Sequence, residues 1–111
     1  MSDYIQVQTT VANRSDALGI ARKVVAMRLA GCVQITACTS VYSWQGTVEQ
    51  DEEYLCTMKS SKGVFDKLKT ALKELHPYAV PEIIATPITG GGEAYLSWLG
   101  EQLAVEDGDE V

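Results

Sequence analysis

Residues 32–59 read CVQITACTSVYSWQGTVEQDEEYLCTMK, with the turn residues Gln45-Gly46 near the centre. The flanking residues are rich in Val, Ile, Thr, Tyr and Trp, which favour strands, and Gln45-Gly46 suits a tight turn. The stretch therefore predicts a β-hairpin with strands over 32–44 and 47–59. Each strand would run to about twelve residues, whereas the usual strand has about five or six.

The surplus length of this hairpin predicts that it projects beyond the domain. Its exposed end would carry Tyr42, Trp44 and Val48. Monomers normally blunt or bury unpaired strand edges and aromatic surface of this kind. We expect a neighbouring subunit to cover the hairpin, with these three residues at the subunit interface. The alternative is a hairpin that curls over the open face of its own sheet.

The residues before the hairpin predict a strand and a helix. Over 4–11, Ile5, Val7, Thr9 and Val11 alternate with more polar residues, as in a strand with one buried face. Ser15-Asp16 is the expected cap of a helix over about 15–30, and Gly31 suits a left-handed residue at its end. The expected buried stripe of this helix consists of Leu18, Ala21, Val25 and Leu29.

The residues after the hairpin predict a helix, a strand and a final helix. Ser60-Ser61 is the expected cap of a helix that Pro77 stops. Its apolar face would hold Val64, Phe65, Leu68, Leu72 and Leu75. Residues 81–89 predict a strand at a sheet edge, because Pro87 cannot donate a hydrogen bond to a ladder. Residues 93–103 predict a helix with Tyr95, Leu96, Leu99 and Leu103 on one side.

The order of these elements is strand, helix, strand, strand, helix, strand, helix. Two crossover units joined by a hairpin predict an α+β, ferredoxin-like fold, a split βαβ arrangement whose antiparallel sheet has helices on one face. We expect a single domain over residues 1–104. Residues 105–111 form an acidic tail with few apolar residues, which predicts disorder.

Composition argues against several classes of function. Nine Lys and Arg against fifteen Asp and Glu give a net charge of −6, which disfavours nucleic-acid binding. No apolar run approaches the roughly 20 residues of a membrane-spanning helix. The first residues, Met1-Ser2-Asp3-Tyr4, lack the features of a secretory signal. We therefore expect a cytoplasmic protein with no membrane partner.

The cysteines at 32, 38 and 56 show no C-x-x-C spacing. Cys32 and Cys38 share a strand face, but six residues at about 3.3 Å each separate them by roughly 20 Å, too far for a bridge or a shared metal. A two-residue turn at 45–46 places Cys56 opposite Ile35 and Cys38 opposite Glu53, on opposite faces of the hairpin. We expect buried, reduced thiols.

Catalytic motifs are missing from the sequence. The sole histidine is followed by Pro77, and neither G-x-S-x-G nor H-E-x-x-H occurs, so we expect no enzyme activity. Glu49, Asp51 and Glu53 alternate along one strand at spacings of about 6.6 Å, which favours a solvated edge over a cation site.

Three stretches carry a family resemblance. They are SVYSWQG at 40–46, HPYAVPEI at 76–83 and YLSWL at 95–99. With them, residues 4–103 resemble the CutA family of divalent-cation-tolerance proteins. The resemblance implies a homotrimer of ferredoxin-like subunits in a PII-like arrangement, a role in tolerance of divalent metals and, in some members, copper binding.

The copper ligands that the resemblance implies are a cysteine in the first strand and a histidine pair before Pro-Tyr. Here these positions hold Thr9, Leu75 and His76. Imidazole suits copper, zinc and nickel, so His76 is the candidate ligand for weak binding of Cu(II) or another divalent metal. No cofactor is expected to be required.

Polar residues at predicted strand ends are candidates for a ligand cleft between subunits. They are Lys59, Tyr78 and Glu82. Beside a non-enzymatic trimer for metal tolerance, two alternatives remain open. One is a small-molecule sensor of the PII or ACT kind with ligands in intersubunit clefts, and the other is a structural trimerisation module.

Overall fold

The computed structural model describes residues 3–104, and the predicted acidic tail at 105–111 lies outside the described residues. The elements follow the predicted order. They are β1 (Tyr4–Val11), α1 (Arg14–Ala26), β2 (Cys32–Trp44), β3 (Thr47–Ser61), the 3₁₀ turn η1 (Lys62–Val64), α2 (Phe65–Leu75), β4 (Ile84–Pro87) and α3 (Glu93–Gln102). The predicted α+β, ferredoxin-like fold with a long hairpin between β2 and β3 is confirmed.

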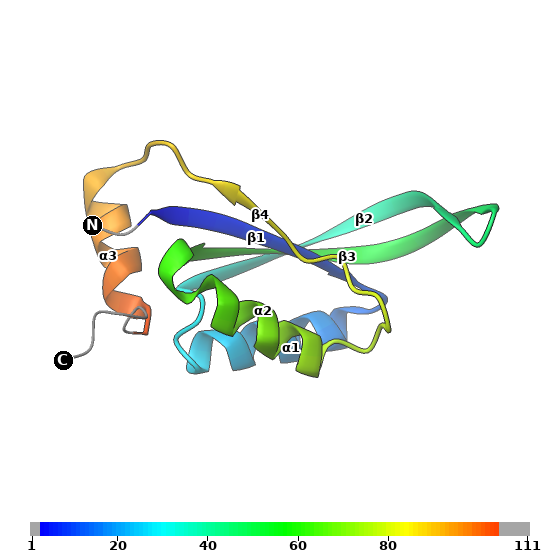
Figure 1. The fold of residues 1–111 in the computed structure, drawn as a ribbon, viewed down its shortest axis with the longest axis horizontal. Coiled ribbons are helices and arrows are strands. Elements are labelled where there is room, and N and C mark those ends of the chain that lie inside the picture. The colour runs from blue at the N-terminus through cyan, green and yellow to red at the C-terminus, as the bar shows by residue number, and fades with distance from the viewer. Residues whose placement is uncertain (1–2, 105–111) are drawn as a thin grey trace.

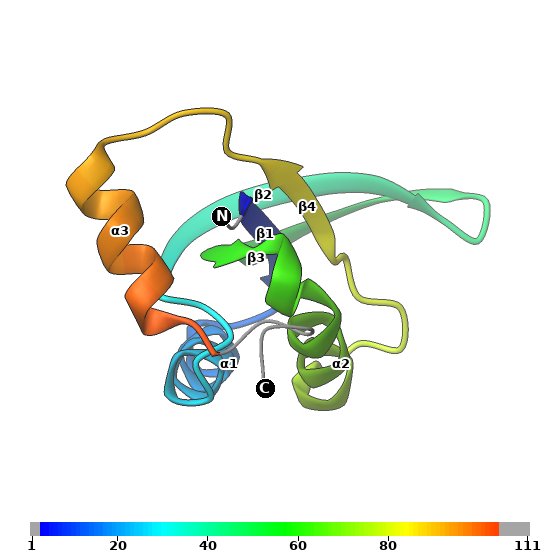
Figure 2. The same ribbon diagram turned by 60° about the vertical axis from the view of Figure 1, so that its left-hand side comes forward.

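The sheet has four antiparallel strands in the order β2-β3-β1-β4. The predicted edge position of the last strand is confirmed, although β4 is shorter than expected. In β1, Ile5, Val7, Thr9 and Val11 are all buried, as their alternation predicted. Helices α1 and α2 lie side by side against this face, and α3 lies across the end of the sheet where β1 begins (Figures 1 and 2).

Helix α1 differs from its prediction at both ends. The cap is Asn13, whose side-chain oxygen accepts the Asp16 N–H at 2.8 Å, so Ser15 and Asp16 lie inside the first turn. The helix ends at Ala26, and the left-handed residue that follows is Arg28, with φ 62°, rather than Gly31. The buried residues of the helix are Ala17, Ile20, Ala21 and Val24. Of the predicted stripe, Ala21 and Leu29 are buried, Leu18 is partly buried, and Val25 is 41% exposed.

Arg28 and Gly31 join α1 to the last helix. The Arg28 guanidinium donates to the carbonyls of Glu101, Gln102 and Leu103 at 2.8–3.1 Å, which satisfies carbonyls at the end of α3. A Cβ at Gly31 would lie 2.6 Å from Cδ1 of Leu99. Gly31 therefore permits close packing of α3 and does not terminate α1.

The start of the second helix also differs from the prediction. Ser60 and Ser61 belong to β3 and are buried, and the Ser60 hydroxyl donates to the Leu29 carbonyl at 2.7 Å. Helix α2 begins only after η1, without a side-chain cap. Its end agrees with the sequence: His76 has extended backbone angles, as expected for a residue before proline.

The hairpin pairs without interruption from Cys32 opposite Lys59 to Trp44 opposite Thr47. Gln45 and Gly46 both have positive φ, 51° and 82°, as a type I′ turn requires. The hairpin extends away from the rest of the molecule (Figure 1). The molecule, with its hairpin, therefore measures 49 Å along its longest axis and 27 and 25 Å along the other two. The predicted projection of the hairpin is confirmed. The hairpin does not curl over the open face of its own sheet, which was the alternative.

The predicted hairpin register is also confirmed. Cys56 lies opposite Ile35, and Cys38 lies opposite Glu53. All three cysteines are free thiols, but only Cys56 is buried, whereas Cys32 and Cys38 are partly exposed. Burial raises the pKa of the Cys56 thiol. The expectation of buried thiols therefore holds for one cysteine and is wrong for the other two.

Candidate functional site

The sheet surface opposite α1 and α2 carries the polar residues of β3, and we call it the open face. Along β3, Cys56 and Met58 are buried against the helices. Residues 53, 55, 57 and 59 point to the other side, because side chains alternate along a strand. The open face therefore has Glu53 toward the hairpin and Lys59 toward the opposite end.

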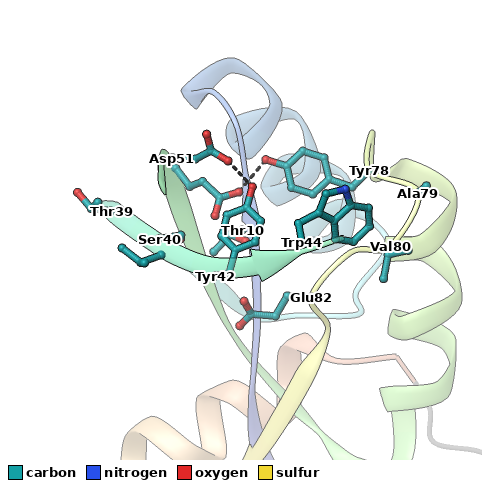
Figure 3. Close-up of a pocket in the computed structure, with 12 residues that line it drawn as sticks. Thr10, Thr39, Ser40, Tyr42, Trp44, Asp51, Tyr78, Ala79, Val80 and Glu82 are labelled. Carbon is teal, nitrogen blue, oxygen red and sulfur yellow. Dashed lines mark hydrogen bonds between the residues drawn. The ribbon is translucent and has the colours of Figure 1, made fainter. Parts of the chain in front are cut away.

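A cavity of about 780 Å³ lies between the hairpin and residues 78–82, the segment that joins α2 to β4 (Figure 3). We call it the hairpin cavity. Its walls combine aromatic rings, hydroxyls and carboxylates. The lining residues are Thr10, Thr39, Ser40, Val41, Tyr42, Trp44, Asp51, Glu53, Tyr78, Ala79, Val80 and Glu82.

Two tyrosine hydroxyls donate to carboxylates in this cavity. The Tyr42 hydroxyl pairs with Asp51, and the Tyr78 hydroxyl lies 2.7 Å from Oε2 of Glu53 (Figure 3). The hydrogen bond to Asp51 raises the pKa of Tyr42 to about 12. Burial, followed by the hydrogen bond to Glu53, raises the pKa of Tyr78. Both phenols stay protonated at neutral pH, so the carboxylates give the cavity a negative charge.

His76 holds the segment that carries Tyr78. Its Nδ1 accepts the Tyr78 N–H at 3.1 Å, and its Nε2 lies 2.9 Å from the Thr10 carbonyl. Because a carbonyl only accepts, the neutral ring carries its proton on Nε2. The His76 and Tyr78 rings are also in contact, with centroids 4.8 Å apart. His76 thus positions Tyr78 over Glu53.

The environment of His76 favours the neutral ring. The residue is only 7% exposed. Burial lowers the pKa of His76, although the Thr10 carbonyl and the carboxylates of Glu53 and Asp16 act in the opposite direction. Since both ring nitrogens already have partners, a metal ion at His76 would have to break one of these hydrogen bonds.

No group of three or more His, Cys, Asp or Glu side chains within residues 3–104 could hold a metal ion. At the first-strand position where the resemblance implies a cysteine, Thr9 lies opposite Cys56, and its buried hydroxyl has no hydrogen-bond partner among the described residues. The metal site at His76 therefore stays a prediction.

The structure brings four of the predicted binding residues together and separates two. Tyr42, Trp44, Tyr78 and Glu82 line the hairpin cavity. Val48, which is 75% exposed near the hairpin tip, does not line it. Lys59 does not lie at a strand end as predicted, because β3 continues to Ser61, and its Nζ donates to Gln34 at 2.9 Å. Glu82 precedes β4 instead of beginning it.

Asp51 and Glu53 have a role that the sequence pattern did not indicate, since their alternation favoured a solvated edge. Glu53 is only 8% exposed because Tyr78 covers it. The sequence did indicate that Tyr42 could reach Asp51. The predicted register puts Ser40 opposite Asp51, and Tyr42 follows Ser40 by two residues, so its side chain lies on the same face of the hairpin. No local pattern indicated that residues 76–78 would reach Glu53.

Residues 5–102 match the family model described as CutA1 divalent ion tolerance protein. The chain belongs to this family. The divalent-cation tolerance protein CutA of Thermus thermophilus is 48% identical over 96 residues, which cover 86% of this chain and 93% of that protein. The chloroplastic protein CutA of Arabidopsis thaliana is 42% identical over 96 residues, and the match spans 86% of this chain but 53% of that longer protein.

Solved structures of CutA proteins share the fold. The structure of the Thermus thermophilus protein superposes with a TM-score of 0.87 at 45% identity and covers 94% of this chain and 100% of that chain. CutA1 from Pyrococcus horikoshii has a TM-score of 0.88 at 32% identity, covering 91% of this chain and 99% of that chain. The α+β ferredoxin-like assignment therefore agrees with experimental structures of the CutA family.

Within residues 3–104, no helix is both long enough and apolar enough to cross a bilayer. The cytoplasmic location expected from the sequence stays a prediction.

Proposed function

We propose that this CutA-family chain acts without catalysis in tolerance of divalent cations, as a homotrimer in a PII-like arrangement. The main observation that supports a trimer is the projecting hairpin. Its strand β2 is an edge strand of 13 residues, so one side of its backbone has no partner strand within the described chain. Such an edge pairs readily with another chain.

Apolar side chains on and near the hairpin support the same proposal. Val41 is 63% exposed, Trp44 49% and Val48 75%, and Val80, which lines the hairpin cavity, is 71% exposed. Soluble monomers seldom expose apolar groups in one connected region, and such regions mark interaction sites. Burial between subunits would remove these side chains from water.

Light scattering at micromolar concentration tests the trimer. We expect a mass three times that of the 12.1 kDa chain. A mass of 12.1 kDa would contradict the proposal.

The state of His76 supports a role without catalysis. Both ring nitrogens hold the backbone of neighbouring segments, so neither is free to act as a base on a substrate. Direct capture of copper or another divalent metal would rest on His76, or on copies of it from different subunits, and we propose that such binding is weak.

The hairpin cavity favours a second candidate function, a sensor that binds a small molecule in clefts between subunits. A screen of metals, nucleotides and common metabolites by thermal unfolding separates the candidates, because a ligand of the native state raises the melting temperature by mass action. A shift with divalent metals supports the tolerance role, whereas a shift with a nucleotide or metabolite alone supports the sensor. A trimer that responds to neither would be a structural module.

A further inference from the structure

Charge is distributed unequally along the sheet. All nine Lys and Arg of the sequence lie within residues 3–104. Among them, Lys59 alone lies in a strand of the sheet. The others lie in or next to the helices: Arg14, Arg22, Lys23, Arg28, Lys62, Lys67, Lys69 and Lys73. The open face therefore presents a single basic side chain among the described residues, at the end farthest from the hairpin.

The opposite end of the open face is acidic. Asp51, Glu53 and Glu82 line the hairpin cavity, and no Lys, Arg or His of the described chain lines it. Glu53 is 8% exposed, and its hydrogen-bond partner is the neutral Tyr78 hydroxyl. Burying a carboxylate is costly unless a cation or several donors compensate it. Within residues 3–104, the cavity thus combines three carboxylates, one of them largely buried, with no cationic side chain.

Lys59 of the same chain cannot supply this charge. It is six residues from Glu53 along β3, a separation of roughly 20 Å at about 3.3 Å per residue. Its ammonium group instead donates to the neutral Gln34 side chain at 2.9 Å. A neutral partner on the surface is readily exchanged for a carboxylate. The two complementary groups therefore lie at opposite ends of one face of one molecule.

We propose that Lys59 of one copy of the chain enters the hairpin cavity of the next copy and pairs there with Glu53 and Glu82. The contact is heterologous, because each copy offers its basic end to the acidic end of its neighbour. Heterologous contacts close into rings when the rotation between copies permits. The inference rests on the proposed homotrimer and identifies a residue with which each neighbour completes the cavity.

The test compares dissociation of the full-length protein on dilution, measured by analytical ultracentrifugation, for the wild type and for Lys59→Glu. Placing a third carboxylate between Glu53 and Glu82 should weaken association on the order of 100-fold. Lys73→Glu on α2 makes the same change in net charge at an exposed site outside the open face, and should leave association unchanged. Circular dichroism verifies that each variant is folded.

A charge exchange separates a specific pair from a general loss of packing. Glu82→Lys alone should also weaken association, because two basic groups would then meet. Combining Lys59→Glu with Glu82→Lys should recover at least about tenfold of the lost affinity, since opposite charges face each other again.

The possible results distinguish this contact from the trimer itself. A monomeric wild type would overturn the proposed homotrimer and this contact with it. If the wild type is a trimer and the Lys59→Glu variant dissociates no more readily than the Lys73→Glu variant, the contact is overturned but the trimer is not. The same conclusion would follow if the combined variant associated no better than either single variant.

Discussion

His76 shows how one residue connects the fold to the candidate site. Its ring joins the end of β1, through the Thr10 carbonyl, to the backbone of Tyr78 in the segment before β4. Protonation of Nδ1 would place two donors, the ring N–H and the Tyr78 N–H, against each other. The hydrogen bonds seen in the structure therefore require the neutral ring.

A pH dependence of stability follows from this arrangement. Burial lowers the pKa of His76 in the folded state, whereas in the unfolded chain the imidazole has its ordinary pKa of about 6.5. As pH falls below about 6.5, the unfolded state binds more protons than the folded state, so the free energy of unfolding decreases. Urea unfolding of the wild type and His76→Ala, at pH 5 to 8 and one protein concentration, measures this effect.

At neutral pH we expect His76→Ala to be less stable by about 1–3 kcal/mol, because buried backbone groups lose their partners. This difference should shrink from pH 7 to pH 5, since only the wild type suffers from protonation of the ring. Carboxylates common to both proteins cancel in the comparison. A difference that stays constant across this range would show that His76 does not titrate in the way proposed.

At the scale of elements, the outer part of the hairpin lies outside the core. The buried core cluster contains Cys56 and Met58 from β3, and Val33, Ile35 and Tyr54 pack against it, but no residue between 36 and 53 belongs to it or packs on it. The outer hairpin is instead an interaction surface with exposed Val41, Trp44 and Val48. Removal of this part should change assembly more than it changes folding of the domain.

Deleting residues 42–48 tests this separation. We expect the trimer to be lost, giving monomer or aggregate by light scattering, because interface residues are removed and strand edges exposed. The far-ultraviolet circular dichroism of the soluble fraction should still show folded helices, since α1 and α2 pack on the retained core. An unchanged trimer would place the subunit interface elsewhere.

At the scale of the whole molecule, the chain carries the CutA fold without a preformed metal cluster in residues 3–104. The copper site that we propose would depend on His76, whose ring nitrogens are hydrogen-bonded to the Thr10 carbonyl and the Tyr78 N–H. Metal binding must then compete with these hydrogen bonds and, at acid pH, with protonation of the ring. Affinity for copper should be weak and should decrease as pH falls.

Calorimetric titration with Cu(II), for the wild type and His76→Ala at neutral and acid pH, checks this expectation. The wild type should bind weakly at neutral pH, and the variant should bind less. Tight binding that survives His76→Ala would place the metal elsewhere, for example on the carboxylates of the hairpin cavity. If neither protein binds copper, the proposed tolerance role does not work through direct capture of this metal.

The sequence alone predicted the elements whose patterns are local. Alternation in β1, the length and turn of the hairpin, and Pro87 at an edge strand each depend on neighbouring residues or on a two-residue period, and all were correct. Helix boundaries were less accurate. Asn13 and Ser15 are both acceptable caps, and the choice of Asn13 depends on how the chain leaves β1.

The candidate site required the tertiary structure. Tyr42, Tyr78 and Glu82 were each identified from sequence, but their meeting in one cavity depends on the path of residues 76–83 around the end of β1. The same path buries Glu53, which local alternation had assigned to a solvated edge. Periodic patterns report which face of an element is apolar, whereas the position of a loop depends on contacts between residues far apart in the chain.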